Sequence, residues 1–272
     1  MAMPRKATML IAQISDLHIS RPGQNTCGVA PMADNLAACI DSLNGLAVRP
    51  DVVLISGDVT QSGTPQEVAH AAHLLATLDS PYYMVPGNHD NRQALWDAFG
   101  GTACPTRENG FLNFALTDHP VQIIGLDSTT PGKPGGAICP NRAAWLRARL
   151  IEADGAPVVI VLHHPPLRLG VPETDVDGFA NAADLGAIVE EFPNIERLLC
   201  GHIHLETHSR WHGSVVTTAP SMGMQLTLGL GSDGPSQFFL SPPAYLLHHW
   251  TADGILVTHN IGVAPLDGPH GF

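Results

Sequence analysis

The chain has 272 residues, and its length and 44% hydrophobic content predict one α/β domain spanning residues 1–272. The 25 acidic and 13 basic residues give a formal net charge of -12, which argues against a nucleic-acid-binding surface. The apolar stretch near the N-terminus is too short for a signal peptide or a membrane span, so we expect a cytoplasmic protein with no membrane contact.

Strand-like and helix-like segments alternate through the first 200 residues. Short aliphatic and β-branched runs predict strands at residues 8–14, 52–55, 82–85, 111–116, 121–126, 157–162 and 195–200. Amphipathic spacing and helix start signals predict helices at 35–48, 64–78, 140–152 and 182–192. A β-rich tail follows at 214–260, and we expect it to complete the second sheet and part of the substrate rim. The pattern predicts two packed mixed β-sheets flanked by helices.

Five of these strands are followed by side chains that bind metals. The carboxyl ends of strands in an open α/β sheet are where ligands usually bind. Taken singly, each residue has another explanation as a turn cap, a loop polar group or a buried imidazole. Five such strand ends in order favour a metal site, and its candidates are Asp16, His18, Asp58, Asn88, His89, His163, His202 and His204.

The donor types restrict the metal. Imidazole combined with carboxylate suits Zn, Mn, Fe or Co, and the absence of cysteine from the set argues against a closed structural zinc site. His164 follows a candidate ligand on an extended chain, so we expect it to have a structural or supporting role. Asp90 is expected to orient His89 or to cap a helix. His248, His249 and His259 are candidates for the outer site or for structural hydrogen bonds.

The motifs D-x-H, GD, GNHD, HHPP and GHIH occur in this order between residues 14 and 204. They resemble the signature of the calcineurin-like binuclear metallophosphoesterases. The contexts GNHD, HHPP and CGHIH, with the later LSPPAYLLHH, are similar to bacterial class III cyclic-nucleotide phosphodiesterases and glycerophosphodiesterases. The resemblance implies a four-layer αββα sandwich whose motif-bearing core spans residues 8–204.

The resemblance also implies the role of each motif residue. Asp16, His18 and His204 would bind the first metal ion, and Asn88, His163 and His202 the second, with Asp58 bridging both. The two ions would be divalent or of mixed valence and would share a bridging hydroxide that attacks a small phosphodiester. His89 would be catalytic, and His89 and Asn88 would contact the substrate.

Departures from related families narrow the expected substrate. The arginine of the GD-x-x-DRG motif of protein phosphatases is absent, since residues 57–63 read GDVTQSG. We therefore expect a preference for diesters, with a phosphomonoesterase or a nucleotide pyrophosphatase as the alternative. A non-catalytic scaffold is a third hypothesis, weakened because no motif residue is lost. The natural diester stays open, and so does a homo-oligomeric state, because Ser62 replaces the cysteine of a dimerisation loop found in some glycerophosphodiesterases.

Three loops are expected to form the substrate rim, at 19–31, 167–178 and 229–243. Phe238 and Phe239 lie in the last of them and are candidates for stacking on a base or covering a glycerol group. Core or oligomer contacts are the alternative for both rings.

Overall fold

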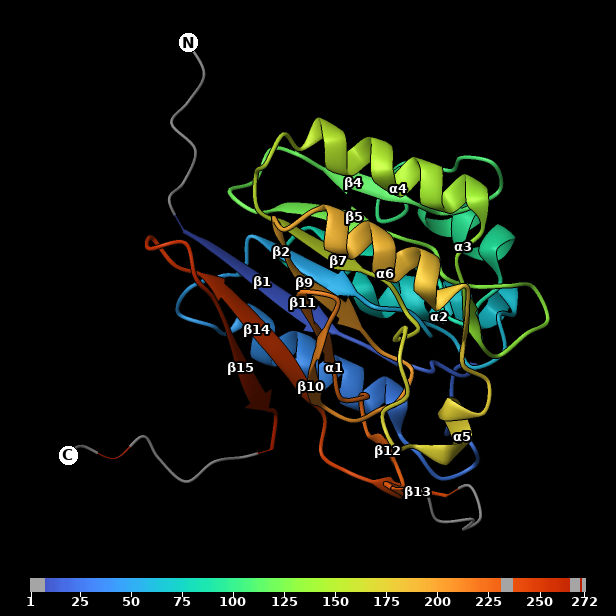
Figure 1. Ribbon diagram of the computed structural model, residues 1–272. Helices are drawn as coiled ribbons and strands as arrows, with labels where there is room; N and C mark the ends of the chain where they lie inside the picture. The colour runs from blue at the N-terminus through green and yellow to red at the C-terminus, as the bar shows by residue number, and fades with distance from the viewer. Residues whose placement is uncertain (1–7, 231–236, 265–269, 271–272) are drawn as a thin grey trace.

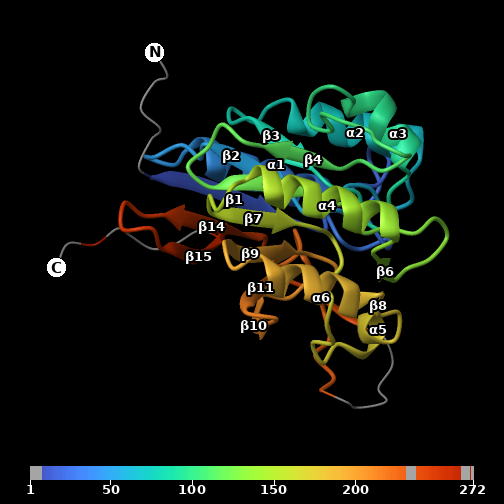
Figure 2. The same ribbon diagram turned by 45° about the horizontal axis from the view of Figure 1, so that its top comes forward.

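The computed structural model describes residues 8–230, 237–264 and 270. Two β-sheets pack face to face, and helices cover the outer face of each (Figure 1, Figure 2). In the described residues the first sheet has the order β15-β14-β1-β2-β3 and the second β10-β11-β9-β7-β5-β4. The predicted four-layer αββα arrangement of two mixed sheets is confirmed.

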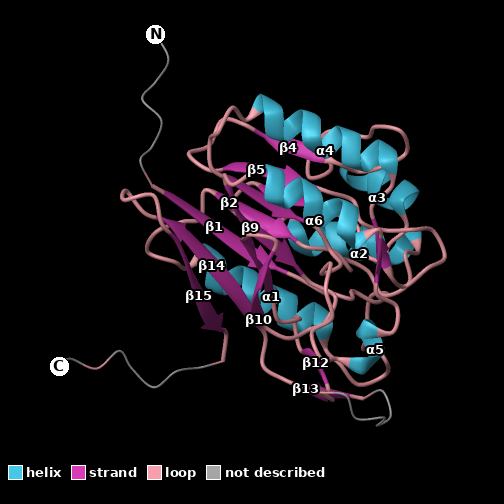
Figure 3. Ribbon diagram, viewed as in Figure 1, coloured by secondary structure: helices cyan, strands magenta, loops and turns pink. Residues whose placement is uncertain are grey.

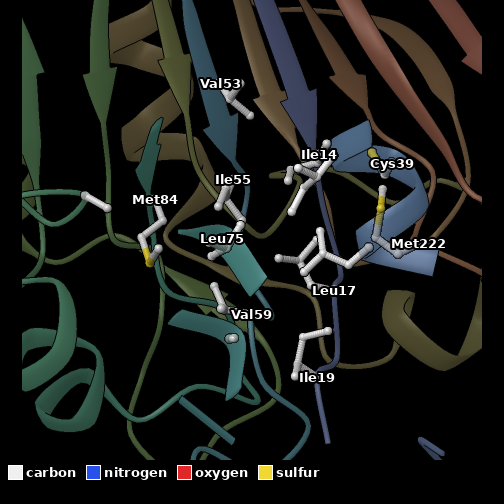
Figure 4. Close-up of a cluster of buried hydrophobic side chains, with 14 of the residues drawn as sticks. Ile14, Leu17, Ile19, Cys39, Val53, Ile55, Val59, Leu75, Met84 and Met222 are labelled. Atoms are coloured by element: carbon white, nitrogen blue, oxygen red, sulfur yellow. The ribbon is translucent and has the colours of Figure 1, made fainter. Parts of the chain in front are cut away.

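The first sheet contains three parallel strands and a C-terminal hairpin. Its strands are β1 (Met9–Ile14), β2 (Val52–Ile55), β3 (Tyr82–Met84), β14 (Ala244–Trp250) and β15 (Leu256–Gly262). Its outer face is covered by the helices α1 (Met32–Asn44), α2 (Pro65–Leu75) and α3 (Arg92–Phe99). Figure 4 shows this packing, with Ile14, Val53 and Ile55 directed toward Leu75 and its neighbours.

The second sheet is built around the parallel strands β5, β7, β9 and β11. Its members are β4 (Phe114–Leu116), β5 (Gln122–Gly125), β7 (Val158–Val161), β9 (Ile195–Cys200), β10 (Thr207–Trp211) and β11 (Ser214–Thr218). The helices α4 (Pro140–Glu152) and α6 (Ala182–Glu191) pack on its outer face. Shorter elements lie beside the sheets, namely α5 (Pro172–Asp175) and the strand pairs β6 (Gly136–Ala137) with β8 (Phe179–Ala180) and β12 (Met224–Leu226) with β13 (Phe238–Leu240).

The central strands are apolar throughout because both of their faces are covered. In β2, Val53 and Ile55 point to the helices, whereas Val52 and Leu54 point to the other sheet. Side chains alternate between the faces of a strand, so a strand buried on both sides shows an unbroken apolar run. This is the pattern that identified β2 in the sequence.

The sequence-based expectations need several corrections. The tail at 214–260 was expected to complete the second sheet, but among its described residues only β11 joins that sheet, whereas β14 and β15 extend the first sheet. The helix expected at 64–78 ends at Leu75, and the one expected at 35–48 spans Met32–Asn44. The elements α3, α5 and β10 were not predicted, because each is short, and α5 and β10 also carry few apolar residues. No helix among the described residues is long and apolar enough to cross a membrane.

His248 joins the two sheets and does not line the outer site. Its ring is fully buried, with Nδ1 2.8 Å from Thr258 Oγ1 and Nε2 3.1 Å from Gln13 Oε1. The Gln13 amide in turn donates to Cys200 O of the second sheet at 2.9 Å. Since Gln13 Oε1 can only accept, the His248 proton lies on Nε2, and Thr258 donates to Nδ1. His249 and His259 also lie in the β14–β15 hairpin. His249 pairs with Leu10 near the start of β1, at the opposite end of that strand from Asp16.

This buried imidazole predicts acid sensitivity. Burial lowers the pKa of His248 to about 3, so between pH 6.5 and 3 the unfolded chain binds a proton that the folded chain does not. The free energy of unfolding should therefore fall by about 2 kcal/mol from pH 7 to pH 5 on account of this residue. Urea unfolding of wild type and His248→Gln at both pH values, with the same added metal, should show a smaller loss in the variant. Equal losses in the two proteins would contradict the prediction.

Candidate metal centre

The seven predicted metal ligands converge at one end of the two sheets. The parallel strands β1, β2 and β3 of the first sheet and β7 and β9 of the second end there, and the loops that follow them gather at this end (Figure 3). Ligand atoms of Asp16, His18 and His204 lie within 4.8 Å of one another, and so do those of Asp16, Asp58 and His163. The amide oxygen Oδ1 of Asn88 is 3.1 Å from His163 Nε2. The structure thus brings together ligands from strands far apart in the sequence.

Most of these residues have an unusual backbone conformation. A positive φ occurs at five of the seven predicted ligands, Asp16 (53°), His18 (43°), Asp58 (50°), His202 (72°) and His204 (58°). Left-handed backbone costs a non-glycine residue on the order of 1–3 kcal/mol, and such strain concentrates at functional sites. The turns after β1, β2 and β9 are therefore held in a strained backbone conformation that directs these side chains toward one another.

Two motif glycines allow the turns to approach one another. A Cβ on Gly87 would lie 2.3 Å from the Asp58 backbone nitrogen, and one on Gly57 would lie 2.4 Å from His163 Nδ1. Gly57 also has a φ of +97°. Any side chain at either position would push a predicted ligand out of place, which explains glycine in the GD and GNHD motifs.

Asp58 occupies the centre of the cluster. Its Oδ2 lies 3.3 Å from His163 Nε2 and 3.6 Å from His18 Nε2, one residue from each predicted metal set. Its Oδ1 accepts a hydrogen bond from the His89 backbone N–H at 2.9 Å. Its Oδ2 is directed at both histidines, which is a position suited to a carboxylate that bridges two metal ions.

The hydrogen bonds of the imidazoles test whether a cation fits. The Nδ1 atoms of His163 and His204 lie 2.8 Å from Ser56 O and 2.6 Å from Met224 O, so both Nδ1 atoms must donate. His18 Nδ1 lies 3.0 Å from Gln61 Oε1 in the same way. In the neutral rings all three Nε2 atoms then carry lone pairs, and those of His18 and His204 face each other at 3.0 Å. Opposed lone pairs beside carboxylates repel unless a cation lies between them, so these residues fit bound metal ions.

The burial of the cluster also favours bound metal ions, because it sets the protonation states of the histidines. Burial holds the pKa values of His18 and His202 well below 6.5, so both imidazoles are neutral, which is the form that binds metal. Burial also acts to lower the pKa of His163, but the nearby carboxylates of Asp58 and Asp16 raise it to about 9. Without a metal ion, His163 is therefore protonated and its positive charge balances these carboxylates. A bound metal ion would supply that positive charge instead.

His89 is positioned at this centre with one nitrogen free. Its Nδ1 lies 2.8 Å from the Gln61 carbonyl oxygen, to which it must donate. Its ring contacts that of His18 edge-on, with 4.7 Å between the centroids. The Nε2 atom is therefore left to take up or give a proton. Gln61, which the sequence analysis did not single out, orients His18 through its side chain and His89 through its backbone.

Asp90 neither orients the His89 ring nor caps the following helix. Its carboxylate accepts hydrogen bonds from the backbone N–H groups of Gly87, Val59 and Thr60 at 2.9–3.0 Å. These bonds join the turn after β2 to the turn after β3. The N-cap of α3 is instead Asn91, whose Oδ1 accepts from two backbone N–H groups of the first turn.

His164 packs beside two of the predicted ligands and holds no metal itself. It lies close enough to His163 and His202 to form a three-histidine cluster. Its Nε2 donates to Pro134 O at 2.9 Å, and its Nδ1, 2.8 Å from Ser128 Oγ, accepts from that hydroxyl. Both ring nitrogens are therefore occupied, and neither has a lone pair left for a metal. This agrees with the structural role expected from the sequence.

A pocket of about 230 Å³ opens from the cluster. Each of the three loops expected at the rim contributes to its lining, among others Cys27, Glu173, Asp177 and Phe238. Residues 231–236 of the third loop lie outside the described residues. Phe239 is 62% exposed and is not among the lining residues, so only one of the two phenylalanines faces the pocket. The acidic lining residues were not predicted, because nothing in the local sequence indicates where α5 would lie.

Comparison with known proteins agrees with this geometry. The model of the calcineurin-like phosphoesterase family matches residues 9–206, which include every strand-end motif. The chain belongs to the calcineurin-like phosphoesterases. This confirms the family predicted from the motifs.

The chain is similar to proteins from several bacteria. A probable glycerophosphodiester phosphodiesterase GpdQ of Arcobacter nitrofigilis is 32% identical over 97% of both chains. The 3',5'-cyclic adenosine monophosphate phosphodiesterase CpdA of Escherichia coli is 27% identical, covering 81% of this chain and 78% of that protein. Among solved structures, a dimetal phosphatase from Danio rerio has a similar fold, with a TM-score of 0.65, 14% identity and coverage of 94% and 99%.

Proposed function

We propose that this phosphoesterase is a metal-dependent phosphodiesterase that hydrolyses small phosphodiesters. The observation that carries the proposal is the position of Asp58 Oδ2 between His18 and His163, one from each predicted metal set. The similarity to proteins named as glycerophosphodiester and cyclic-nucleotide phosphodiesterases supports the reaction class. Glycerophosphodiesters are our first candidate substrates, since the GpdQ relatives are more identical and align over more of the chain. Cyclic nucleotides are the second.

The proposed ligands form two sets that share one carboxylate. Asp16, His18 and His204 would hold one ion, Asn88, His163 and His202 the other, and Asp58 would contact both. The donors are nitrogen and oxygen only, so we propose Mn, Fe, Zn or Co, divalent or of mixed valence. When bound, such a pair of ions withdraws charge from phosphoryl oxygens and lowers the pKa of a water molecule.

Residues around the metal site would bind the phosphate, transfer a proton and hold the ligand turns in place. Asn88 and His89 line the pocket and would contact the phosphate. His89 Nε2, the free ring nitrogen, would carry the proton that the leaving alkoxide takes up, while Gln61 O holds the ring by Nδ1. Asp90 would keep this turn fixed against the Asp58 turn. All five cysteines are free thiols, which supports a cytoplasmic location.

The absence of a basic residue from the pocket lining supports a diester substrate. No lysine or arginine lines the pocket in the described part of the chain. Arg92, the nearest basic residue after GNHD, is bound instead to Asp127, with Nε 2.6 Å from Oδ2. A phosphomonoester dianion brings two charges and usually meets such a cation, whereas a diester brings one charge and a second ester arm.

The diester preference can be tested with two chromogenic substrates. The kcat/KM of the Mn²⁺-loaded protein should be at least about tenfold higher for bis(p-nitrophenyl) phosphate than for p-nitrophenyl phosphate, because no lysine or arginine of the described pocket lining is there to bind the second charge of the monoester. The same preparation serves for both substrates, which removes differences in metal loading. A higher kcat/KM for the monoester would overturn the proposed function.

A further inference from the structure

Each predicted metal set combines ligands from both β-sheets. In the first set, Asp16 and His18 follow β1 of the first sheet, whereas His204 follows β9 of the second. In the second set, Asn88 lies in the turn after β3 of the first sheet, whereas His163 follows β7 of the second. The distances between the ligands of each set therefore depend on how the two sheets are placed against each other.

Most of the layer between the sheets is apolar and does not fix this placement closely. Ile11 and Leu54 of the first sheet share one buried cluster there with Val159 and Leu199 of the second, and Figure 2 shows the two sheets stacked. Hydrophobic burial has no preferred direction, so such contacts tolerate small shifts of one sheet over the other. A hydrogen bond restricts both distance and angle. Polar groups in this layer therefore determine the position of the ligand turns more closely than apolar groups do.

Gln13 lies in β1 with a fully buried side chain, and it connects three of the strands that lead to ligands. Its Nε2 donates to Ser56 Oγ and to Cys200 O, both at 2.9 Å. Ser56 directly follows β2 and precedes Asp58 by two residues. Cys200 ends β9 and precedes His202 by two residues. One amide group thus joins the ends of β1, β2 and β9.

A chain of hydrogen bonds holds the Gln13 amide in this orientation. Cys200 O can only accept, so Nε2 must face it and Oε1 must face His248, whose Nε2 donates at 3.1 Å. His248 Nδ1 accepts from Thr258 Oγ1 at 2.8 Å, and Thr258 Oγ1 accepts from Arg197. Arg197 and Cys200 both belong to β9, so the chain leaves the second sheet, crosses β15, β14 and β1 of the first, and returns.

We propose that Gln13 is a positioning residue, which sets the spacing of the metal ligands by holding the ends of β1, β2 and β9 together. This inference rests on the proposed two-metal centre and assigns Gln13 no contact with an ion. Gln13 acts through Ser56, whose carbonyl oxygen accepts from Nδ1 of the predicted ligand His163 at 2.8 Å. It also acts through Cys200, which leads into the turn of His202. A shift of these turns changes the ligand distances at both ions together.

The variant Gln13→Met tests the inference, because it nearly keeps the length of the side chain and removes its hydrogen bonds. The dissociation constants of both Mn²⁺ ions should rise by about tenfold, the lower end of the effect of losing an outer-shell partner, since Gln13 acts one contact further out. Bound Mn²⁺ is measured in the loaded protein by equilibrium dialysis against chelator-buffered concentrations of the free ion. The electron paramagnetic resonance spectrum should change as well, because the coupling of two Mn²⁺ ions depends on their separation and bridging ligand.

The matched control is Val52→Ala, which removes buried side-chain atoms from the same layer at the start of β2. It should lower the free energy of unfolding through lost packing, and leave both dissociation constants and the spectrum unchanged. Unchanged dissociation constants in Gln13→Met would overturn the inference, because Gln13 would then contribute to stability alone. An equal rise in Val52→Ala would overturn it too, because lost packing would then explain the effect.

A second variant decides the question if Gln13→Met does not fold. Ser56→Ala removes the acceptor of one Gln13 hydrogen bond and keeps the carbonyl oxygen that binds His163. Its dissociation constants should rise by about threefold, as expected for the loss of one hydrogen bond, and unchanged values would contradict the role of Gln13. If the wild type does not bind two ions per chain, the proposed metal centre fails and the inference falls with it.

Discussion

Replacing Asp58 with asparagine should lower metal affinity at both sites by about 100-fold or more, because loss of even an outer-shell partner costs 10–100-fold. Asp58 Oδ2 lies near a histidine of each predicted set, 3.3 Å from His163 Nε2 and 3.6 Å from His18 Nε2. Asparagine keeps the shape of the side chain and tolerates the φ of 50° at this position, so the change is mainly one of charge.

Metal analysis of dialysed protein measures this effect. The comparison variant is Asn88→Ala, which removes a ligand predicted for the second ion only and should lower the metal content by one ion per chain. The Asp58→Asn variant should lose both ions under the same conditions. Two retained ions in the Asp58 variant would show that this carboxylate does not bridge.

Replacing His89 with alanine should lower kcat by on the order of 100-fold or more while the metal content stays unchanged. The ring has its Nδ1 bound to Gln61 O, and its Nε2 is the atom available for proton transfer in the pocket. The backbone N–H of residue 89 still donates to Asp58 Oδ1 in the variant, so the ligand turn keeps its support.

The metal measurement separates two roles for His89. A ring nitrogen of His89 lies within 4.8 Å of ligand atoms of His18 and Asp58, so the geometry also permits His89 to bind a metal ion. Loss of a metal ion together with activity would favour that role and contradict catalysis by His89. A normal kcat in the His89→Ala variant would exclude both a catalytic role and a metal-ligand role for His89. His73→Ala, at an exposed position of α2, is a control for the loss of a histidine.

The layered fold and the position of the candidate ligands at one sheet edge were predictable from the sequence for one physical reason. A strand buried on both faces gives an unbroken apolar run, and the residues just after it must lie at the sheet edge where such strands end. Asp58 after β2 and His163 after β7 could therefore be placed at one edge without any structure. The parallel pairing of these strands confirms that reasoning.

Features that depend on contacts distant in sequence were not predictable. The sequence of β14 does not reveal that it pairs with β1, so β14 and β15 of the tail were assigned to the wrong sheet. Gln61 looks like an ordinary turn residue in the sequence, and only the structure shows its side chain bound to His18 and its backbone carbonyl bound to His89. The role of α5 in the pocket depends on the path of a loop, which local propensity does not determine.

The most direct test of the proposed two-metal centre is a titration of metal-depleted protein with Mn²⁺. Hydrolysis of bis(p-nitrophenyl) phosphate is followed as metal is added to protein at a concentration well above the dissociation constants. Because Asp58 joins two ligand sets, activity should rise until two equivalents per chain are bound and then stay constant. Full activity at one equivalent, or activity without metal, would contradict the account.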